Sequence, residues 1–144
     1  MSERLSKKIK RAVIERAHGC CEYCCSQEAF ATEDFSIEHI FPQQSGGSTS
    51  LDNLALSCQG CNGHKYAKVT GIDPITQTEA SLFHPRQHQW YDHFTWNEDF
   101  TLMVGFTPTG RATIATLKLN RPGVANMRRL LYAVQRHPPA HLLQ

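Results

Sequence analysis

The chain has 144 residues, of which 40% are hydrophobic and 19% are charged. This length and composition predict one soluble globular domain with a modest core. No stretch approaches the roughly 18 apolar residues that a membrane-spanning helix requires, so we expect no membrane partner. A net charge of +2 by itself excludes neither an enzyme nor a binding protein.

The charge is distributed unevenly along the chain. Residues 1–18 carry six Lys or Arg against two acidic residues, residues 19–99 carry three against eleven, and residues 100–144 carry six and no acid. Two basic flanks therefore bracket an acidic centre, which suits a polyanion held over a central cation site. Basic residues that only solvate helix faces explain the same pattern equally well.

The N-terminal stretch is basic and predicts a helix over residues 5–18. Ile9, Ala12 and Val13 recur at helical spacing, and Gly19 is a plausible C-cap. The stretch has no uninterrupted apolar segment, so it is not a secretory signal, and we expect a cytoplasmic location. Thiols stay reduced there, so paired cysteines indicate metal ligands or catalytic groups before disulfides.

Two Cys-x-x-Cys pairs predict a zinc site. A pair of thiolates two residues apart can turn toward one ion, and two such pairs make a tetrahedral set that suits Zn²⁺, with Zn–S distances of about 2.3 Å. Redox-active or unligated thiols are the alternative. Cys25 is spare, and Cys20 is spare unless it replaces Cys21. Four thiolates close the coordination shell, so this zinc is expected to be structural. The expected ligands are Cys21, Cys24, Cys58 and Cys61.

The 33 residues between the two pairs predict a strand, a loop and a second strand, and the residues from the second pair onward predict a helix. The first strand spans residues 34–41 and ends at Pro42. The second spans residues 51–56, after a flexible turn at residues 45–48. The helix begins at Cys61 or Asn62 and runs to about Lys68, before Thr70-Gly71.

This segment also carries a candidate catalytic constellation. The Glu38 carboxylate and the Asn62 side-chain carbonyl are hard oxygen ligands suited to Mg²⁺. His39 is a neutral imidazole near pH 7 that can take a proton from water. Lys65 lies one helical turn after Asn62 and could pair with a phosphate. A cation beside a base predicts phosphodiester hydrolysis. For an isolated Glu-His dipeptide, an ordinary surface pair is the better interpretation.

The order Glu38-His39, Asn53, Asn62 resembles the HNH (His-Asn-His) endonuclease family, in the subtype with a four-cysteine zinc site. The resemblance is specific over residues 21–65. It implies a ββα-metal fold and cleavage of DNA by nicking or double-strand cutting, with 5′-phosphate and 3′-hydroxyl products. By similarity, His39 is the general base, Glu38 and Asn62 hold one Mg²⁺ or Mn²⁺, and Asn53 fixes the loop that orients His39.

The segment departs from the family pattern at two positions. The carboxylate before the histidine is most often Asp in the family, and Glu38 is one methylene longer. The third motif residue is Asn62 rather than His, which favours Mg²⁺ or Mn²⁺ over softer ions. His64 lies close enough to be an alternative ligand or a phosphate contact.

Residues 71–144 predict an extension of the core. We expect an irregular connector over 72–86, a short helix or turn over 87–94, a hairpin with strands at 100–106 and 113–119, and a helix from Pro122 to about Arg136. The stripe expected to be buried on that last helix is Val124, Met127, Leu131 and Val134.

The same half holds candidate contacts to DNA. The residues expected at its phosphates are Arg111, Arg128 and Arg129, with Arg86 and Arg121 as further candidates. The histidines and tryptophans of this half are expected to be packed or solvent-facing rather than to ligate metal or stack on bases. They are His84, His88, His93, Trp90 and Trp96.

Together these observations predict an α+β fold: a ββα-metal core over residues 20–70 stapled by a four-cysteine zinc site, an N-terminal helix, and a C-terminal β-hairpin plus helix, in one nuclease domain over residues 1–144. The expected function is a metal-dependent HNH endonuclease acting on DNA, expected to be double-stranded. The alternatives are a non-catalytic zinc-knuckle nucleic-acid-binding protein and a purely structural HNH-like module. There is no clear dimerisation heptad.

Overall fold

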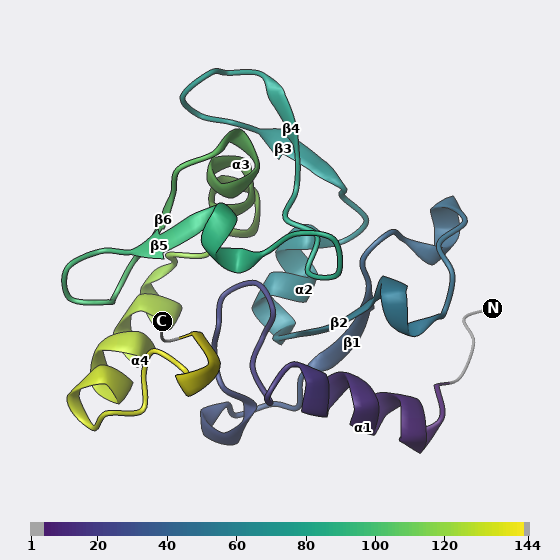
Figure 1. The fold of residues 1–144 in the computed structure, drawn as a ribbon, viewed down its shortest axis with the longest axis horizontal. Coiled ribbons are helices and arrows are strands. Elements are labelled where there is room, and N and C mark those ends of the chain that lie inside the picture. Colours follow the sequence, from purple (N-terminus) through teal and green to yellow (C-terminus); the bar gives the residue numbers. More distant parts are fainter. Residues whose placement is uncertain (1–4, 143–144) are drawn as a thin grey trace.

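A computed structural model of the protein describes residues 5–142, so the first four and last two residues of the expected domain lie outside the described part. The helix α1 (Lys7–Arg16) begins at Ser6, whose side-chain oxygen accepts a hydrogen bond from the backbone N–H of Ile9 at 3.1 Å. Val13 and Ala17 are buried against Leu54 and Leu56 of the second strand. The N-terminal helix therefore covers the strands that carry the candidate site (Figure 1).

The predicted strand–loop–strand–helix order is present in the centre of the chain. Strands β1 (Ser36–His39) and β2 (Leu54–Ser57) pair antiparallel, with His39 opposite Leu54 and Glu38 opposite Ala55. Helix α2 (Gln59–Lys65) follows directly. It contacts β1 on one side and the later helix α3 on the other, as Figure 1 shows.

The boundaries of these elements differ from the sequence expectations. The second strand begins at Leu54 rather than residue 51, because Leu51–Asn53 forms a 3-10 turn. The helix begins at Gln59, two residues before Cys61, since the thiol of Cys58 caps it by accepting a hydrogen bond from the N–H of Cys61. It ends at Lys65 because Tyr66 adopts a positive φ of 50°.

The connector expected to be irregular contains a hairpin, so that expectation is wrong. Strands β3 (Thr70–Ile72) and β4 (Glu79–Ser81) pair antiparallel. Asp73 organises the loop between them, because its carboxylate accepts hydrogen bonds from the N–H of Ile75 at 3.0 Å and the hydroxyl of Thr76 at 2.9 Å. Strands of three residues are too short to show a period-two pattern in the sequence.

The second half of the expected 100–119 hairpin is a helix, which corrects that prediction. Strand β6 (Met103–Gly105) pairs with β5 (Phe94–Trp96), and the chain then enters α3 (Pro108–Leu117). Thr107 caps this helix by accepting from the N–H of Gly110 at 3.0 Å, with Pro108 at its first turn. A capped start with proline inside it favours a helix over the strand suggested by alternation.

The last long helix, α4 (Pro122–Ala133), ends three residues before the expected Arg136. Its buried face also differs from the expectation. Val124 is buried as predicted, but Met127 and Val134 are exposed, and Arg128 takes a buried position. The guanidinium of Arg128 donates from its two Nη atoms to the backbone oxygens of Cys24, Thr101 and Leu119 at 2.8–3.0 Å inside the protein.

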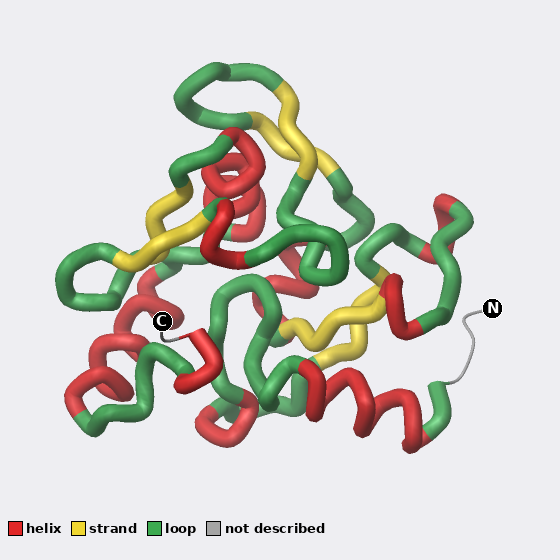
Figure 2. Tube along the Cα trace, in the orientation of Figure 1, coloured by secondary structure: helices red, strands yellow, loops and turns green. Residues whose placement is uncertain are grey.

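The main core lies between α2, α3 and the strands of the C-terminal half. It joins the aromatic residues Phe83 and Phe94 to Leu117 and Leu119, and it includes the cysteine pairs. Trp90 and Trp96 pack against it as half-buried rings, 5.3 Å apart at their centroids. Loops make up much of the trace between these short elements (Figure 2). Within residues 5–142, no helix is both long and apolar enough to cross a membrane.

Candidate metal centre and active site

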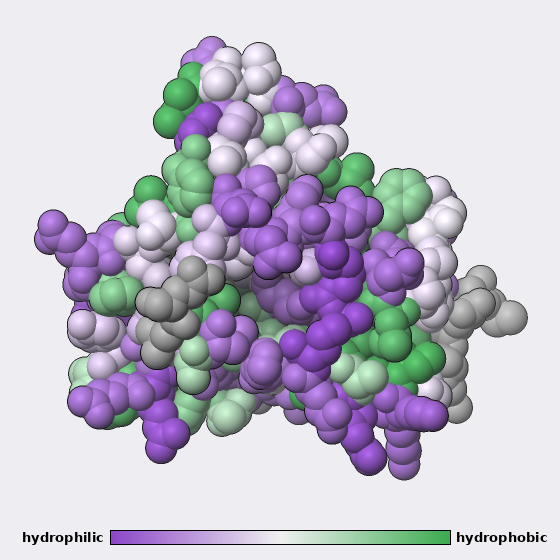
Figure 3. All heavy atoms as spheres, viewed as in Figure 1, coloured by the Kyte–Doolittle hydropathy of each residue, from purple (hydrophilic) through white to green (hydrophobic). Residues whose placement is uncertain are grey.

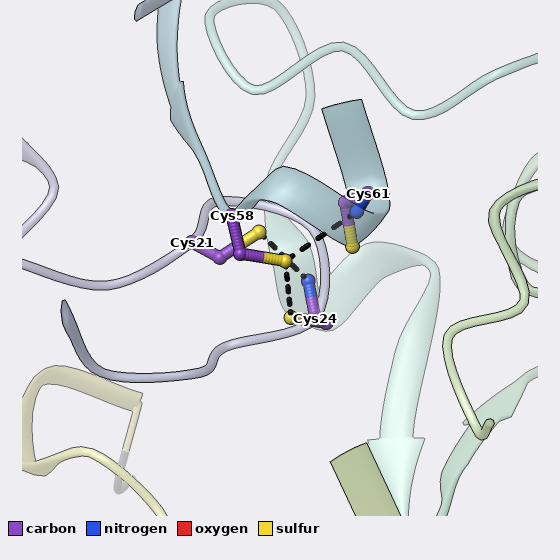
Figure 4. A group of neighbouring side chains, drawn as sticks. All are labelled: Cys21, Cys24, Cys58 and Cys61. Carbon is purple, nitrogen blue, oxygen red and sulfur yellow. Dashed lines mark hydrogen bonds between the residues drawn. The ribbon is translucent and has the colours of Figure 1, made fainter. Parts of the chain in front are cut away.

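The four cysteines predicted to bind zinc lie together. Cys21 and Cys24 come from the loop after α1, and Cys58 and Cys61 come from the start of α2, as Figure 4 shows. Their sulfur atoms all lie within 4.8 Å of one another, and all four residues are buried. Cys20 and Cys25 are buried outside this group, so the question of which cysteine pairs with Cys24 is settled in favour of Cys21.

The spacing of the sulfur atoms fits a tetrahedral zinc site. Four ligands at about 2.3 Å from one ion lie about 3.8 Å from each other, and the Sγ atoms of Cys24 and Cys58 are 3.6 Å apart. Each pair also receives a backbone N–H: Cys24 donates to the sulfur of Cys21 at 3.5 Å, and Cys61 donates to that of Cys58 at 3.4 Å. Such donors stabilise the thiolate charge that zinc ligation requires.

Arg121 covers the cysteine cluster from the start of α4. Its guanidinium donates to the sulfur of Cys58 at 3.4 Å and to that of Cys61 at 3.5 Å. It is held in place by the backbone oxygen of Lys118 at 3.1 Å. Gly60 makes room for it, since a Cβ at that position would lie 2.5 Å from the Nη2 atom of Arg121. The role expected for Arg121 at a DNA phosphate is therefore corrected to a contact with the thiols of Cys58 and Cys61.

Glu38 lies buried at the end of β1, with 5% of its surface exposed. The hydroxyl of Tyr23 donates to its Oε1 atom, and the ammonium of Lys65 lies 2.8 Å from its Oε2 atom. Burial raises the pKa of Glu38, and the charge of Lys65 and the hydroxyl of Tyr23 oppose that rise. Lys65 also donates to the backbone oxygen of Ile40 at 2.8 Å.

The burial of Lys65 corrects its expected role as a phosphate contact. Its side chain is 1% exposed, and its ammonium contacts Glu38 and the backbone oxygen of Ile40. The Glu38 and Asn62 oxygens have the right chemistry for Mg²⁺ or Mn²⁺, but both carboxylate oxygens of Glu38 are already in use. A divalent ion held by Glu38 would share these oxygens with the Lys65 ammonium and the Tyr23 hydroxyl. Asn62 is half-buried on α2, one helical turn before Lys65.

His39 ends β1 and is half-buried, with its Nε2 atom 2.9 Å from the hydroxyl of Thr49. Asn53 closes the loop between the two strands. Its side chain accepts from the N–H of Phe41 at 2.8 Å and donates to the backbone oxygens of Phe41 and Ser48 at 3.0 and 2.8 Å. This network fixes both ends of the segment that carries Thr49, and so it also determines the position of the hydroxyl beside His39.

The three arginines expected at DNA phosphates lie in different environments. Arg128 is 3% exposed and bound to backbone oxygens, so the expectation that it contacts a phosphate is wrong. The guanidinium of Arg111 forms a bidentate contact with the Asp73 carboxylate, with one nitrogen 2.9 Å from each oxygen. This contact joins α3 to the β3–β4 loop. Arg129 is exposed and bonded only to the side chain of Asn126 among the described residues.

Sequence reasoning missed two groups at the site. Tyr23 donates to the Glu38 carboxylate, and its position between the two cysteines of the first pair is the signal that it would face the core of the site. Thr49 contacts His39, and only its place in the loop after Gly46-Gly47 could have suggested that. Arg86, another candidate phosphate contact, forms an ion pair with Glu22.

Comparison with known proteins identifies the central segment. A model of the HNH endonuclease family matches residues 21–68, from the first cysteine of the cluster to just beyond α2. No curated protein and no solved structure matches the chain significantly. The resemblance noted in the sequence is thus confirmed over this segment, where the arrangement of β1, β2, α2 and the four cysteines fits a zinc-stapled HNH core within a mixed α/β fold.

Proposed function

We propose that this protein is a metal-dependent HNH endonuclease that hydrolyses phosphodiester bonds in double-stranded DNA. The observation that carries the proposal is the coincidence of the family match with the site geometry: residues 21–68 contain Glu38-His39 at the end of β1, beside a helix that carries Asn62 and Lys65. A binding module that never cuts has no use for a carboxylate and a histidine at this place. We assign the protein to the cytoplasm, in keeping with its six unpaired cysteines.

His39 is the proposed general base. A neutral imidazole can accept the proton of the water that attacks the phosphorus atom. The Thr49 hydroxyl at 2.9 Å orients the ring, and the hydrogen bonds of Asn53 hold the segment that presents Thr49. Orientation matters because the water must lie in line with the leaving oxygen. We therefore assign Asn53 and Thr49 as positioning residues.

Glu38 and Asn62 are the proposed ligands of a Mg²⁺ or Mn²⁺ ion. When bound, such an ion supplies positive charge beside the phosphate and the leaving oxygen. The products expected by resemblance are a 5′-phosphate and a 3′-hydroxyl. In the described arrangement the Lys65 ammonium supplies the positive charge next to Glu38, so a bound ion would add its charge beside that of Lys65.

The experiment that tests the proposal follows supercoiled plasmid with purified zinc-loaded protein, in Mg²⁺ or in EDTA. We expect Mg²⁺-dependent nicking or linearisation that is lost in His39→Ala and retained in His18→Ala, which alters an exposed histidine outside the site. DNA binding should remain nearly unchanged in His39→Ala. Retardation of DNA without cutting by any variant would overturn the proposal and identify a nucleic-acid-binding module instead.

A further inference from the structure

A cleft of about 210 Å³ lies beside the end of β1, and apart from Lys65 the residues that line it have no functional role assigned above. Ile40 and Phe41, which directly follow His39, form one wall, and the loop that carries His84 and His88 forms another. None of the described residues that line the cleft is acidic. The loop lies in front of α2 in Figure 1, and Figure 3 shows hydrophilic side chains gathered over that region. The cleft therefore begins one residue from the proposed base.

The hydrogen bonds of the two histidines identify which ring nitrogen carries the proton. The Nδ1 atom of His88 lies 2.9 Å from the backbone N of His84. The Nδ1 atom of His84 lies 3.2 Å from the N of Arg86 and 3.3 Å from the N of Gln87. A backbone N–H can only donate. Each Nδ1 atom is therefore an acceptor without a proton, and each neutral ring carries its proton on Nε2.

This tautomer determines what the histidines can bind. A metal ligand must offer an unprotonated nitrogen, so an Nε2–H group is a donor and not a ligand. Burial, with a smaller effect from His88, also lowers the pKa of His84, which favours the neutral ring. Neither Nε2 atom has a described hydrogen-bond partner. A cleft with two such donors and no carboxylate suits an oxyanion.

We propose that His84 and His88 donate hydrogen bonds from Nε2 to a backbone phosphate of the bound nucleic-acid strand. This inference rests on the proposed function, because the strand that passes His39 is what brings a phosphate to the adjacent cleft. The contact holds the strand in register without reading its sequence. Since the rings are neutral, it adds hydrogen bonds but releases no counterions.

The test uses substitutions that remove the Nε2–H donor and keep an acceptor at the position of Nδ1. Asparagine keeps an oxygen near the position of Nδ1, so His84→Asn and His88→Asn retain the acceptor for the backbone N–H groups of the loop and lose the Nε2–H group. His93→Asn is the matched control, because His93 belongs to the same group of rings but binds Thr107 and does not line the cleft. Binding of a short duplex oligonucleotide is measured in EDTA at about pH 8, where histidine is neutral.

We expect each of the two variants to bind the duplex about threefold to tenfold more weakly, with the slope of log affinity against log salt unchanged. His93→Asn should bind as the wild type does. In ¹⁵N spectra of the imidazole rings, the free protein should show Nε2–H tautomers for His84 and His88, and the duplex should shift those two rings. Unchanged affinity in both variants, Nδ1–H tautomers, or no duplex binding at all would overturn the inference.

Failure of this inference and failure of the proposed function have different outcomes. If the wild-type protein cuts plasmid and both asparagine variants bind and cut as it does, the histidine contact is refuted and the nuclease function is retained. If the protein never cuts but both asparagine variants lose duplex affinity, the nuclease function is refuted and the phosphate contact is retained.

Discussion

Replacement of Arg121 by glutamine is expected to weaken zinc binding without unfolding the protein. Four thiolates around one Zn²⁺ carry a net charge of −2, and this cluster is buried. Arg121 places guanidinium donors 3.4 and 3.5 Å from the sulfurs of Cys58 and Cys61. Its loss leaves the charge of those thiolates less compensated. The four ligands themselves remain.

The magnitude follows from the two hydrogen bonds. A hydrogen bond to a charged group contributes about 1.5–3 kcal/mol. Because Arg121 is partly exposed to solvent, each of its two bonds to sulfur should contribute an amount at or below the lower end of that range. A combined loss of about 1.4–2.7 kcal/mol corresponds to about a 10-fold to 100-fold rise in the Kd for zinc. Loss of an outer-shell partner at other metal sites changes affinity by a similar factor.

The assay is competition for zinc between the folded protein and a chromogenic chelator, beside two further variants. Gly60→Ala leaves Arg121 in the chain but places a Cβ 2.5 Å from its guanidinium, so it should displace that group and weaken zinc binding in the same direction. Arg129→Gln removes an exposed charge from the same helix and should have no effect. Zinc affinity in Arg121→Gln equal to that of the wild type would refute the reasoning.

Three further predictions concern stability and DNA binding. Lys65→Met should lower the unfolding free energy measured in urea by about 3–5 kcal/mol, because it leaves the Glu38 carboxylate buried and unpaired. Adding Glu38→Gln to that variant should recover much of the lost stability. A Lys65→Met variant as stable as the wild type would contradict the buried ion pair. The Arg111 contact holds the pKa of Asp73 below its ordinary value, so the ion pair should stabilise the fold above about pH 4, and that stabilisation should disappear as the pH falls through the lowered pKa. In thermal unfolding, Asp73→Asn should be less stable than the wild type near neutral pH and should lack that loss of stability in acid. An identical pH profile for the two proteins would argue against the ion pair. Arg129→Gln should weaken duplex binding for all sequences and reduce the salt slope by about 0.9, and an unchanged slope would exclude a phosphate contact.

Local sequence was sufficient to predict the four-cysteine cluster and the order of the elements around it. A two-residue gap lets both cysteines of a pair turn toward one point, and that geometry depends on a few backbone angles rather than on the rest of the fold. The thiol cap of Cys58 then starts α2 within the same few residues. For this reason the cysteine pairs and the strand, loop, strand and helix between and after them could be predicted, with errors of two or three residues at the ends.

The C-terminal half could not be predicted to the same degree. Thr113, Ala115, Leu117 and Leu119 alternate as a strand would, yet the segment is mostly helical, because Thr107 and Pro108 start a helix whose buried face packs under β3, β4 and β6. Strands of three residues, such as β3 and β4, carry too little pattern to be seen. Their pairing depends on the Asp73 loop and on contact with α3.

The environment of each charged side chain was decided only by the tertiary structure. The sequence by itself placed a carboxylate and a lysine on facing elements and a basic stretch in the last helix. It did not determine that Lys65 pairs with Glu38 in the interior, that Arg128 binds backbone oxygens there, or that Arg121 covers the thiols. A long cationic side chain can reach either water or a buried acceptor. Which of them it reaches depends on elements distant in the chain: Arg121 and Arg128 lie far beyond Cys24 and Cys58, and only folding brings them together.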